Sequence, residues 1–277
     1  MNDINAPIGL FDSGVGGLTV ARHVRSELPF ERLLYIADSA YAPYGTKSVA
    51  EVEDRSVQLS RALLEHGVKA LVVACNTATA AAIVRLRSLY RIPIIGMEPA
   101  VKPAVAVTRN GVIGVLATEG TLNSDKFFRL QAEFGRGVRI ITQACPGLVE
   151  QVEKGDLDGI RTRQLTADYL DRLISRGADT VVLGCTHYPF LRPLLESLAG
   201  PQVRILDAGA AVSKEVRRQL EKRGLAAEVT QRGGLEVLTT GDVDAVRTVV
   251  SSLWGKPLNV NLLECSELAV DLRSRFV

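Results

Sequence analysis

The sequence predicts an α/β protein built from two similar halves, each a mostly parallel sheet flanked by helices. Short apolar runs alternate with longer helical stretches along the chain, which is typical of parallel sheets. The second observation is an internal repeat of a helix–glycine–strand–cysteine unit. Residues 71–77 (LVVACNT) resemble residues 181–187 (VVLGCTH), which lie 110 positions later. The repeat therefore places Cys75 and Cys185 at corresponding points of the two halves.

Apolar and helical patterning predict the elements of each half in order. The first half has expected strands at residues 8–11, 33–36, 69–74 and 92–95, and expected helices at 18–27, 48–66 and 78–89. Ser48 and Glu51 form a capping-box pattern at the start of the second of these helices. The second half repeats this pattern, with expected strands at 112–116, 138–142, 181–184 and 203–206, and helices from about 124, through Glu150 and Glu153, and at 159–176.

The remaining C-terminal residues have no first strand of their own. They carry expected helices at 211–223 and 243–254 and a hairpin around Gly233 and Gly234. We therefore expect them to return and complete the first domain. The predicted domains are residues 1–97 plus 208–277, which carry Asp12 and Cys75, and residues 98–207, which carry Glu153, Cys185 and His187.

Composition and charge narrow the classes of function. A net charge of +2 is too small to argue for binding to nucleic acid or to an anionic membrane. No apolar run approaches membrane-spanning length, and the start of the chain (MND) lacks the basic and apolar regions of a signal peptide. The cysteines at 75, 145, 185 and 265 form no CxxC pair, and the chain has only three histidines. We therefore expect a cytoplasmic protein with no structural metal.

A glycine-rich turn follows the first expected strand, at residues 12–17 (DSGVGG). It invites a dinucleotide-binding interpretation, but the GxGxxG pattern fails because Thr19 stands where the third glycine belongs. The glycines more simply allow a tight turn and the close approach of a small ligand. Asp12 and Ser13 then lie at the carboxyl end of a strand, where open α/β sheets place their ligands.

The two repeated cysteines allow several interpretations. A cysteine at the end of an apolar strand is often a small buried residue, and this is our interpretation of Cys145 and Cys265. A redox pair at Cys75 and Cys185 would lack the CxxC spacing of oxidoreductases. A cysteine–histidine nucleophile would use Cys185 and His187 and leave Cys75 without a role.

Inversion at a carbon that bears hydrogen requires two similar groups. One base removes the proton from one face while an acid delivers a proton to the other, and the roles exchange in the reverse direction. Thiols have a reference pKa near 8.5, close enough to neutrality to serve in either form. Two halves that face each other across a cleft would place Cys75 and Cys185 on opposite faces of a small substrate.

Four motifs resemble those of a known family: residues 9–19 (GLFDSGVGGLT), 43–45 (PYG), 74–79 (ACNTAT) and 183–189 (LGCTHYP). Together they are similar to the glutamate racemases of the pyridoxal-independent aspartate/glutamate racemase superfamily, in order over nearly the whole chain. The resemblance implies two pseudo-symmetric α/β domains with the active site in the cleft between them. It also implies a cytoplasmic homodimer that supplies D-glutamate for peptidoglycan.

The resemblance also implies roles for individual residues. Cys75 would be the base towards D-glutamate, assisted by Asp12, and Cys185 the base towards L-glutamate, assisted by His187. Glu153 lies in a segment, residues 145–153 (CPGLVEQVE), that resembles one bearing a further assisting carboxylate. The residues that match the substrate contacts of the family are Asp12, Ser13, Tyr44, Gly45, Asn76, Thr77, Thr186 and His187. Thr121 is a further candidate, whereas Asp38 and Glu98 are interpreted as structural.

The motifs suit glutamate as the substrate and need no cofactor. Lys47 is the one basic residue near them, so hydroxyls, an amide and backbone N–H groups would hold the substrate carboxylates. A permanent cation would weaken a thiolate as a base. No lysine resembles a Schiff-base residue for pyridoxal phosphate. The alternatives are an aspartate or hydantoin racemase, a Cys185–His187 hydrolase or amidase, and a non-catalytic binding protein.

Overall fold

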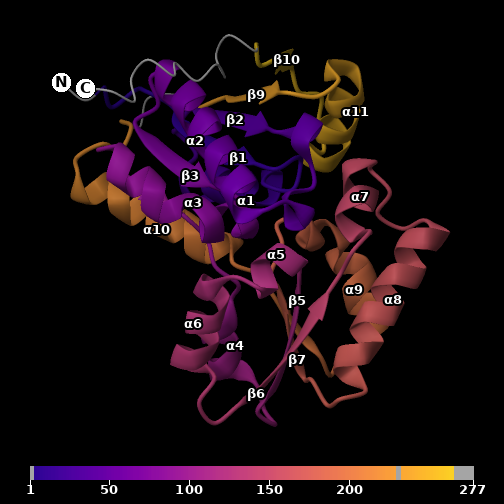
Figure 1. The fold of residues 1–277 in the computed structure, drawn as a ribbon. Helices are drawn as coiled ribbons and strands as arrows, with labels where there is room; N and C mark the ends of the chain where they lie inside the picture. The colour runs from indigo at the N-terminus through magenta and orange to yellow at the C-terminus, as the bar shows by residue number, and fades with distance from the viewer. Residues whose placement is uncertain (1–2, 229–231, 265–277) are drawn as a thin grey trace.

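The computed structural model describes residues 3–228 and 232–264 and contains two β-sheets (Figure 1). All paired strands in both sheets run parallel. The larger sheet has six strands in the order β10-β9-β2-β1-β3-β4. These strands are β1 (Ile8–Asp12), β2 (Leu33–Ala37), β3 (Ala70–Val73), β4 (Ile94–Ile95), β9 (Leu235–Thr239) and β10 (Val260–Leu262).

The smaller sheet repeats the strand order of the larger one. Its four strands lie in the order β6-β5-β7-β8. They are β5 (Val112–Ala117), β6 (Arg139–Ala144), β7 (Thr180–Leu183) and β8 (Arg204–Leu206). The series β4-β3-β1-β2 in one sheet thus corresponds to β8-β7-β5-β6 in the other. The predicted fold class, α/β with two pseudo-symmetric parallel sheets, is confirmed.

Each sheet and its helices form a lobe, and the two lobes are stacked one above the other in Figure 1. The first lobe is the six-stranded sheet with α1 (Leu18–Glu27), α2 (Val49–Glu65), α3 (Asn76–Leu89), α10 (Gly209–Lys222) and α11 (Val243–Trp254). The second lobe is the four-stranded sheet with α4 (Val101–Val107), α5 (Glu119–Leu122), α6 (Asp125–Phe134), α7 (Leu148–Glu153), α8 (Ile160–Ile174) and α9 (Arg192–Ala199). Short 3-10 helices span Ser39–Tyr41, Tyr44–Thr46 and Tyr188–Leu191. The chain passes between the lobes at residues 96–100 and 207–208.

Helices cover both faces of each sheet, as parallel sheets require. In the first lobe α2 packs on α3, and α1 packs on α10 and α11. The apolar stripe of α2 buries Val52, Leu59 and Leu63, as the sequence predicts. Its N-terminus has the predicted capping box, in which the Ser48 hydroxyl accepts from the backbone N–H of Glu51 and the Glu51 carboxylate accepts from the backbone N–H of Ser48. This cap fixes where the helix begins.

One apolar core continues from lobe to lobe. It contains Val15 and Leu18 from the first lobe together with Val149 and Val152 from the second. Two further clusters lie within single lobes, one under α2 and α3 and one around α4 and α6. Because the shared cluster lies beside the glycine-rich turn, packing sets how the carboxyl ends of the two sheets face each other.

The structure also corrects several predicted elements. The hairpin around Gly233 and Gly234 is wrong: β9 follows Gly234 and pairs in parallel with both β2 and β10. Helix α3 begins at Asn76 rather than at residue 78, because the Cys75 sulfur caps it. Strand β6 continues to Ala144, beyond the predicted end at 142. The domain boundaries at 97/98 and 207/208 stay a prediction. Within residues 3–228 and 232–264, no helix is both long and apolar enough to cross a membrane.

Candidate active site

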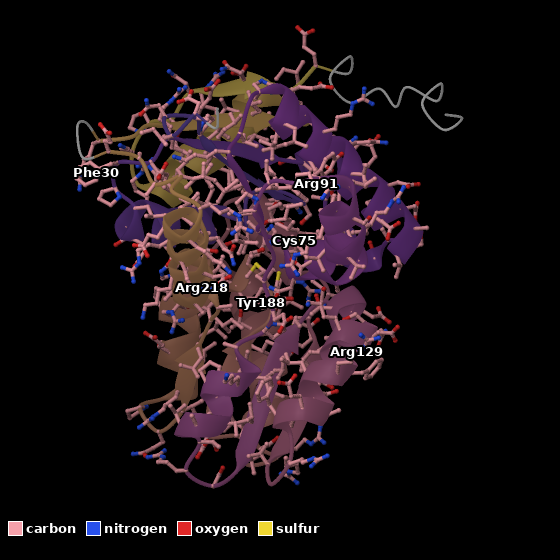
Figure 2. The ribbon with its side chains drawn as sticks, turned by 90° about the vertical axis from the view of Figure 1, so that its left-hand side faces the viewer. Phe30, Cys75, Arg91, Arg129, Tyr188 and Arg218 are labelled. Atoms are coloured by element: carbon pink, nitrogen blue, oxygen red, sulfur yellow. The ribbon has the colours of Figure 1, made fainter. Side chains whose placement is uncertain are left out.

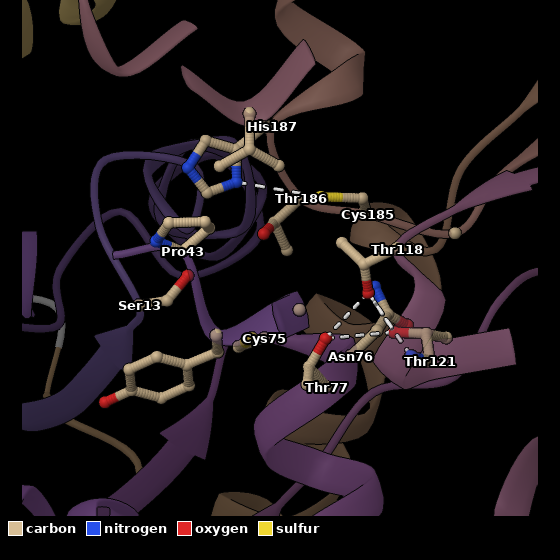
Figure 3. A pocket seen from close by; sticks show the side chains of 14 residues that line it. Ser13, Pro43, Cys75, Asn76, Thr77, Thr118, Thr121, Cys185, Thr186 and His187 are labelled. Carbon is tan, nitrogen blue, oxygen red and sulfur yellow. Dashed lines mark hydrogen bonds between the residues drawn. The ribbon is translucent and has the colours of Figure 1, made fainter. Parts of the chain in front are cut away.

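A small pocket lies where the carboxyl ends of β1, β3 and β7 meet (Figure 3). Figure 2 shows Cys75 and Tyr188 at the junction of the two lobes. Of the eleven predicted site residues, nine line the pocket: Ser13, Tyr44, Gly45, Cys75, Asn76, Thr77, Cys185, Thr186 and His187. Asp12 and Glu153 lie behind this lining and contact it through hydrogen bonds. The space that remains inside is about 10 Å³, room for about one water molecule.

Cys75 follows β3 and serves as the N-cap of α3. The backbone N–H of Ala78 donates a hydrogen bond of 3.4 Å to its sulfur. The side chain is buried, and burial, together with the negative charge of Asp12, raises the pKa of the Cys75 thiol well above its ordinary value. The protonated thiol form of Cys75 is therefore favoured at neutral pH.

Cys185 occupies the corresponding position after β7 and starts a relay of polar groups. Its sulfur lies 3.7 Å from Nδ1 of His187, and Nε2 of His187 lies 2.5 Å from Oε1 of Glu153 (Figure 3 shows the first contact). Burial lowers the pKa of His187, but the hydrogen bonds to Cys185 and Glu153 outweigh it, so the pKa is raised well above its usual value. The imidazole is therefore held protonated between a sulfur and a carboxylate.

The glycine-rich turn makes room for this relay. A Cβ atom at Gly14 would lie 1.9 Å from Oε1 of Glu153, and one at Gly16 would lie 2.3 Å from Nδ1 of His187. No side chain fits there without displacing the pair. The backbone N–H of Val15 also donates to Oε1 of Glu153 at 2.7 Å. The sequence predicts that these glycines allow the close approach of a small ligand, whereas the groups that lie against Gly14 and Gly16 in the structure are side chains of the other lobe.

Asp12 is fully buried and accepts four hydrogen bonds. Its Oδ1 accepts from the backbone N–H of Ser13 at 2.6 Å and from the Ser13 hydroxyl at 3.2 Å. Its Oδ2 accepts from the N–H of Gly17 at 2.5 Å and from the hydroxyl of Thr186 at 3.1 Å. Burial raises the pKa of Asp12, while the positive charge of His187 opposes that shift. Asp12 thus couples electrostatically to Cys75 on one side and to His187 on the other.

Two groups of polar side chains remain for a ligand. Both amide atoms of Asn76 are buried without a hydrogen-bond partner among the described residues, although the side chain lines the pocket. The hydroxyls of Thr77, Thr118 and Thr121 form a ring of hydrogen bonds at 2.9, 3.0 and 3.1 Å (Figure 3). An unpaired amide and neighbouring hydroxyls suit carboxylate oxygens and an ammonium group.

The sequence prediction did not include Thr118. Its signal was its position: Thr118 follows β5 just as Ser13 follows β1, because β5 and β1 correspond in the two sheets. Thr121 was a further candidate, and both residues line the pocket.

Cys145 is buried and its sulfur donates to the backbone carbonyl of Gln143 at 3.3 Å, while Cys265 lies outside the described residues.

Among the described residues, the pocket lining contains no lysine or arginine and no cluster of metal ligands. Lysine and arginine are absent from the described residues around the pocket, and Lys47 instead lies over the ring of Tyr41, outside it. Within the described ranges no three histidine, cysteine or acidic side chains gather as metal ligands would. The site thus brings together two thiols, one imidazole and two carboxylates.

Comparison with known proteins gives the family. The family model for Asp/Glu/Hydantoin racemase matches residues 18–216. A glutamate racemase of Stutzerimonas stutzeri is 51% identical over 259 residues, which cover 92% of this chain and 97% of that protein. The crystal structure of a glutamate racemase isoform from Bacillus anthracis aligns with a TM-score of 0.85 at 34% identity, covering 94% of this chain and 97% of that one.

A second solved structure holds ligands. Escherichia coli glutamate racemase, in complex with L-glutamate and the activator UDP-MurNAc-Ala, aligns with a TM-score of 0.82 at 30% identity, covering 93% of this chain and 97% of that chain. The similarity thus extends over nearly the full length in both sequence and fold. The motifs, the paired sheets and these likenesses agree, and the chain belongs to the Asp/Glu/Hydantoin racemase family of isomerases.

Proposed function

We propose that this enzyme interconverts L- and D-glutamate by two-base proton transfer, with Cys75 and Cys185 acting from opposite faces of the substrate α carbon. The observation that carries the proposal is the pair of thiols, which follow the corresponding strands β3 and β7 and line one pocket. The names of the relatives and the L-glutamate bound to the Escherichia coli protein support glutamate as the substrate.

In the direction from L-glutamate, the Cys185 thiolate removes the α proton and Cys75 delivers a proton to the other face. The protonated His187 stabilises the negative charge on the Cys185 sulfur, while Glu153 holds the imidazole in place. The raised pKa of Cys75 keeps this thiol protonated, so that it carries the proton to be delivered. In the direction from D-glutamate the roles exchange, and Asp12 assists Cys75 as the base.

The polar lining would orient the substrate. Ser13, Asn76, Thr77 and Thr186 would bind its ammonium and carboxylate groups, and the backbone at Tyr44 and Gly45 would add an N–H donor. Asn76 supports this role most directly, because its buried amide has no partner in the described protein. Binding would therefore satisfy a group whose burial otherwise costs free energy.

The cellular role forms part of the same proposal. D-glutamate made in the cytoplasm would supply peptidoglycan synthesis, and the enzyme would act as a homodimer. No cofactor is required, because the thiols supply both acid and base. Activity should persist after exhaustive dialysis and in the presence of hydroxylamine or a metal chelator. Loss of activity under either reagent, restored by pyridoxal phosphate or metal, would overturn this part of the proposal.

The decisive experiment is chiral chromatography of L-glutamate incubated with purified protein and no added cofactor. D-glutamate should appear until the two enantiomers are equal, and parallel incubations with L-aspartate and a hydantoin test the other family substrates. The Cys75→Ala variant should lose racemisation. If instead that variant kept full activity towards an amide or ester substrate, Cys185 and His187 would belong to a hydrolase.

A further inference from the structure

A buried ion pair lies directly behind the pocket wall, on the Cys75 side. Asp38 follows β2, and Arg55 projects from α2. The guanidinium donates to both carboxylate oxygens, from Nε to Oδ2 at 2.8 Å and from Nη2 to Oδ1 at 2.6 Å. The Asp38 side chain is 0% exposed and the Arg55 side chain is 8% exposed. Such forked pairs are strong and directional.

Two hydroxyl groups also donate hydrogen bonds to the Asp38 carboxylate. Tyr44 donates to Oδ2 at 2.5 Å, and Thr240, just beyond β9, donates to Oδ1 at 2.7 Å. The Tyr44 hydroxyl is therefore already engaged and points to Asp38, so any substrate contact of this residue comes from its ring or backbone. The ring of Tyr41 also covers the guanidinium of Arg55 at 3.8 Å.

The segment that this network holds, residues 43–46, separates the pocket from an outer hollow. Pro43, Gly45, Thr118 and Val149 line both the pocket and the neighbouring hollow of about 50 Å³. The segment also fits closely against the second lobe, because a Cβ atom at Gly45 would lie 2.7 Å from Cβ of Thr118. Small shifts of this segment therefore change access to the thiol behind it.

Both Cys75 and Cys185 line the pocket behind this wall, but Cys75 is the thiol that packs with it. Tyr44 and Cys75 belong to one apolar cluster of the first lobe, whereas Cys185 belongs to the cluster shared by the two lobes. A buried ion pair is a weak source of stability, because desolvation offsets its attraction. Its value here lies in the geometry that it imposes.

We propose that Asp38 and Arg55 are positioning residues, whose ion pair fixes Tyr44 and Gly45 as the wall that closes the pocket over Cys75. Asp38 holds the Tyr44 phenol, and Arg55 holds Asp38 in a single orientation. Thr240 ties the same carboxylate to the C-terminal part of the sheet. The kinetic expectation rests on the proposed racemase function, whereas the closure of the wall can be tested without turnover.

The test measures the alkylation rates of Cys75 and Cys185 by iodoacetamide in the free enzyme, site by site, with mass spectrometry. Asp38→Asn and Arg55→Met should raise the Cys75 rate about tenfold, as expected when a hydrogen bond to a charged group is lost. The Cys185 rate should rise less than the Cys75 rate, because Cys185 packs in the cluster shared by the two lobes and not in the cluster of Tyr44. Arg55→Lys should not restore slow alkylation, because an ammonium cannot form the fork.

The chain offers a matched control in a second buried ion pair. Lys69 and Glu31 lie 2.6 Å apart with side chains 2% and 3% exposed, in the first lobe but away from the pocket lining. Lys69→Met breaks that pair and should lower the melting temperature while leaving both alkylation rates unchanged. Tyr44→Phe removes only the hydrogen bond from the Tyr44 hydroxyl to Asp38. This variant replaces the Asp38 and Arg55 variants in the test if those fail to fold. It should raise the Cys75 rate more than the Cys185 rate.

Two outcomes would overturn the proposal. The first is a Cys75 rate that stays at the wild-type value in folded Asp38→Asn or in Tyr44→Phe, which would reduce the network to ordinary stabilisation. The second is an equal rise for both thiols, which would indicate general loosening between the lobes. With glutamate as substrate, the same variants should raise KM about tenfold and change kcat far less. Failure of glutamate turnover in the wild type would refute the proposed substrate and leave the alkylation result standing.

Discussion

The hydroxyl of Thr186, in the second lobe, donates a hydrogen bond of 3.1 Å to Oδ2 of Asp12, in the first lobe. A second hydrogen bond crosses in the opposite direction: the backbone N–H of Val15 in the first lobe donates to Glu153 in the second at 2.7 Å. Each lobe therefore donates a hydrogen bond to a carboxylate of the other lobe: the second lobe to Asp12, and the first lobe to Glu153. The two sets of acid and base groups are complete only when the lobes are together.

The first prediction removes the donor of Thr186. Thr186→Val keeps the shape of the side chain but takes one hydrogen bond from the Asp12 carboxylate, at a cost of about 1.5–3 kcal/mol. We expect kcat/KM for glutamate to fall at least about tenfold in both directions, since 1.4 kcal/mol corresponds to tenfold in rate. Steady-state kinetics with each enantiomer measure this.

Thr166→Val is the matched control for that variant. Thr166 lies on α8, buried, and its hydroxyl has no hydrogen-bond partner among the described residues. Valine should therefore be neutral or stabilising there, with kinetics unchanged. Equal kinetics in Thr186→Val and wild type would mean that the Asp12 contact has no part in the reaction.

The second prediction follows from thiols on two faces of the substrate. In deuterated water, each product molecule should carry deuterium at the α carbon, while the remaining substrate stays mostly protiated early in the reaction. Two separate bases do not share a proton, so the hydrogen removed from one face does not return on the other. Proton NMR and mass spectrometry at low conversion measure both pools. Substantial early transfer of the original hydrogen into product would indicate one base.

The third prediction separates the roles of Asp12 and His187. Enantiomers have equal free energy in water, so the ratio of kcat/KM in the two directions must equal one for any variant. Asp12→Asn and His187→Asn should therefore lower kcat/KM equally both ways, by about 10²–10⁴-fold, as is typical when acid–base assistance is lost. The asymmetry should appear in kcat and KM taken separately.

The α-deuterium isotope effect gives the sharper readout for the same pair of variants. Slowing one proton transfer makes that step more limiting, so the two variants should skew the isotope effect in opposite senses between D- and L-glutamate. The structure supports this division, because His187 contacts Cys185 and the charge of Asp12 acts on Cys75. Identical isotope effects in both variants would assign Asp12 and His187 to the same thiol.

The fourth prediction concerns the pH dependence of Cys75. Burial and the charge of Asp12 raise the pKa of its thiol well above its usual value. Only the thiolate is alkylated, so its rate should still climb about tenfold per pH unit beyond pH 8.5, where an ordinary thiol levels off. Asp12→Asn removes the negative charge, lowers the pKa and should speed alkylation at pH 8. A rate for the wild type that levels off below pH 8.5 would contradict the raised pKa.

Much of the fold was predictable because local patterns and the repeat agree. The helix of residues 18–27 and the helix of residues 243–254 have the predicted bounds, and the capping box of Ser48 is present. The hairpin prediction failed because a pair of glycines such as Gly233 and Gly234 is compatible with many tight turns and does not specify which strands pair. Strand β9 pairs with β2, a strand about 200 residues earlier in the chain. Long-range pairing is not encoded in local turn chemistry.

In the candidate site, too, local motifs were predictable and long-range packing was not. Nine predicted residues line the pocket because motif residues follow corresponding strands, and parallel strands bring their carboxyl ends together. Thr118 and the engagement of the Tyr44 hydroxyl by Asp38 were not predicted. Both depend on how the lobes and loops pack, and a motif does not specify which way a phenol points.

The small space in the pocket, about 10 Å³, has a consequence for the catalytic cycle. The proposed substrate, glutamate, is much larger than one water molecule, so part of the pocket lining must move to admit it. Movement of one lobe away from the other would break the contacts from Thr186 to Asp12 and from Val15 to Glu153. We therefore predict that a glutamate molecule bound without these contacts keeps its α hydrogen, and that exchange with solvent requires the closed form.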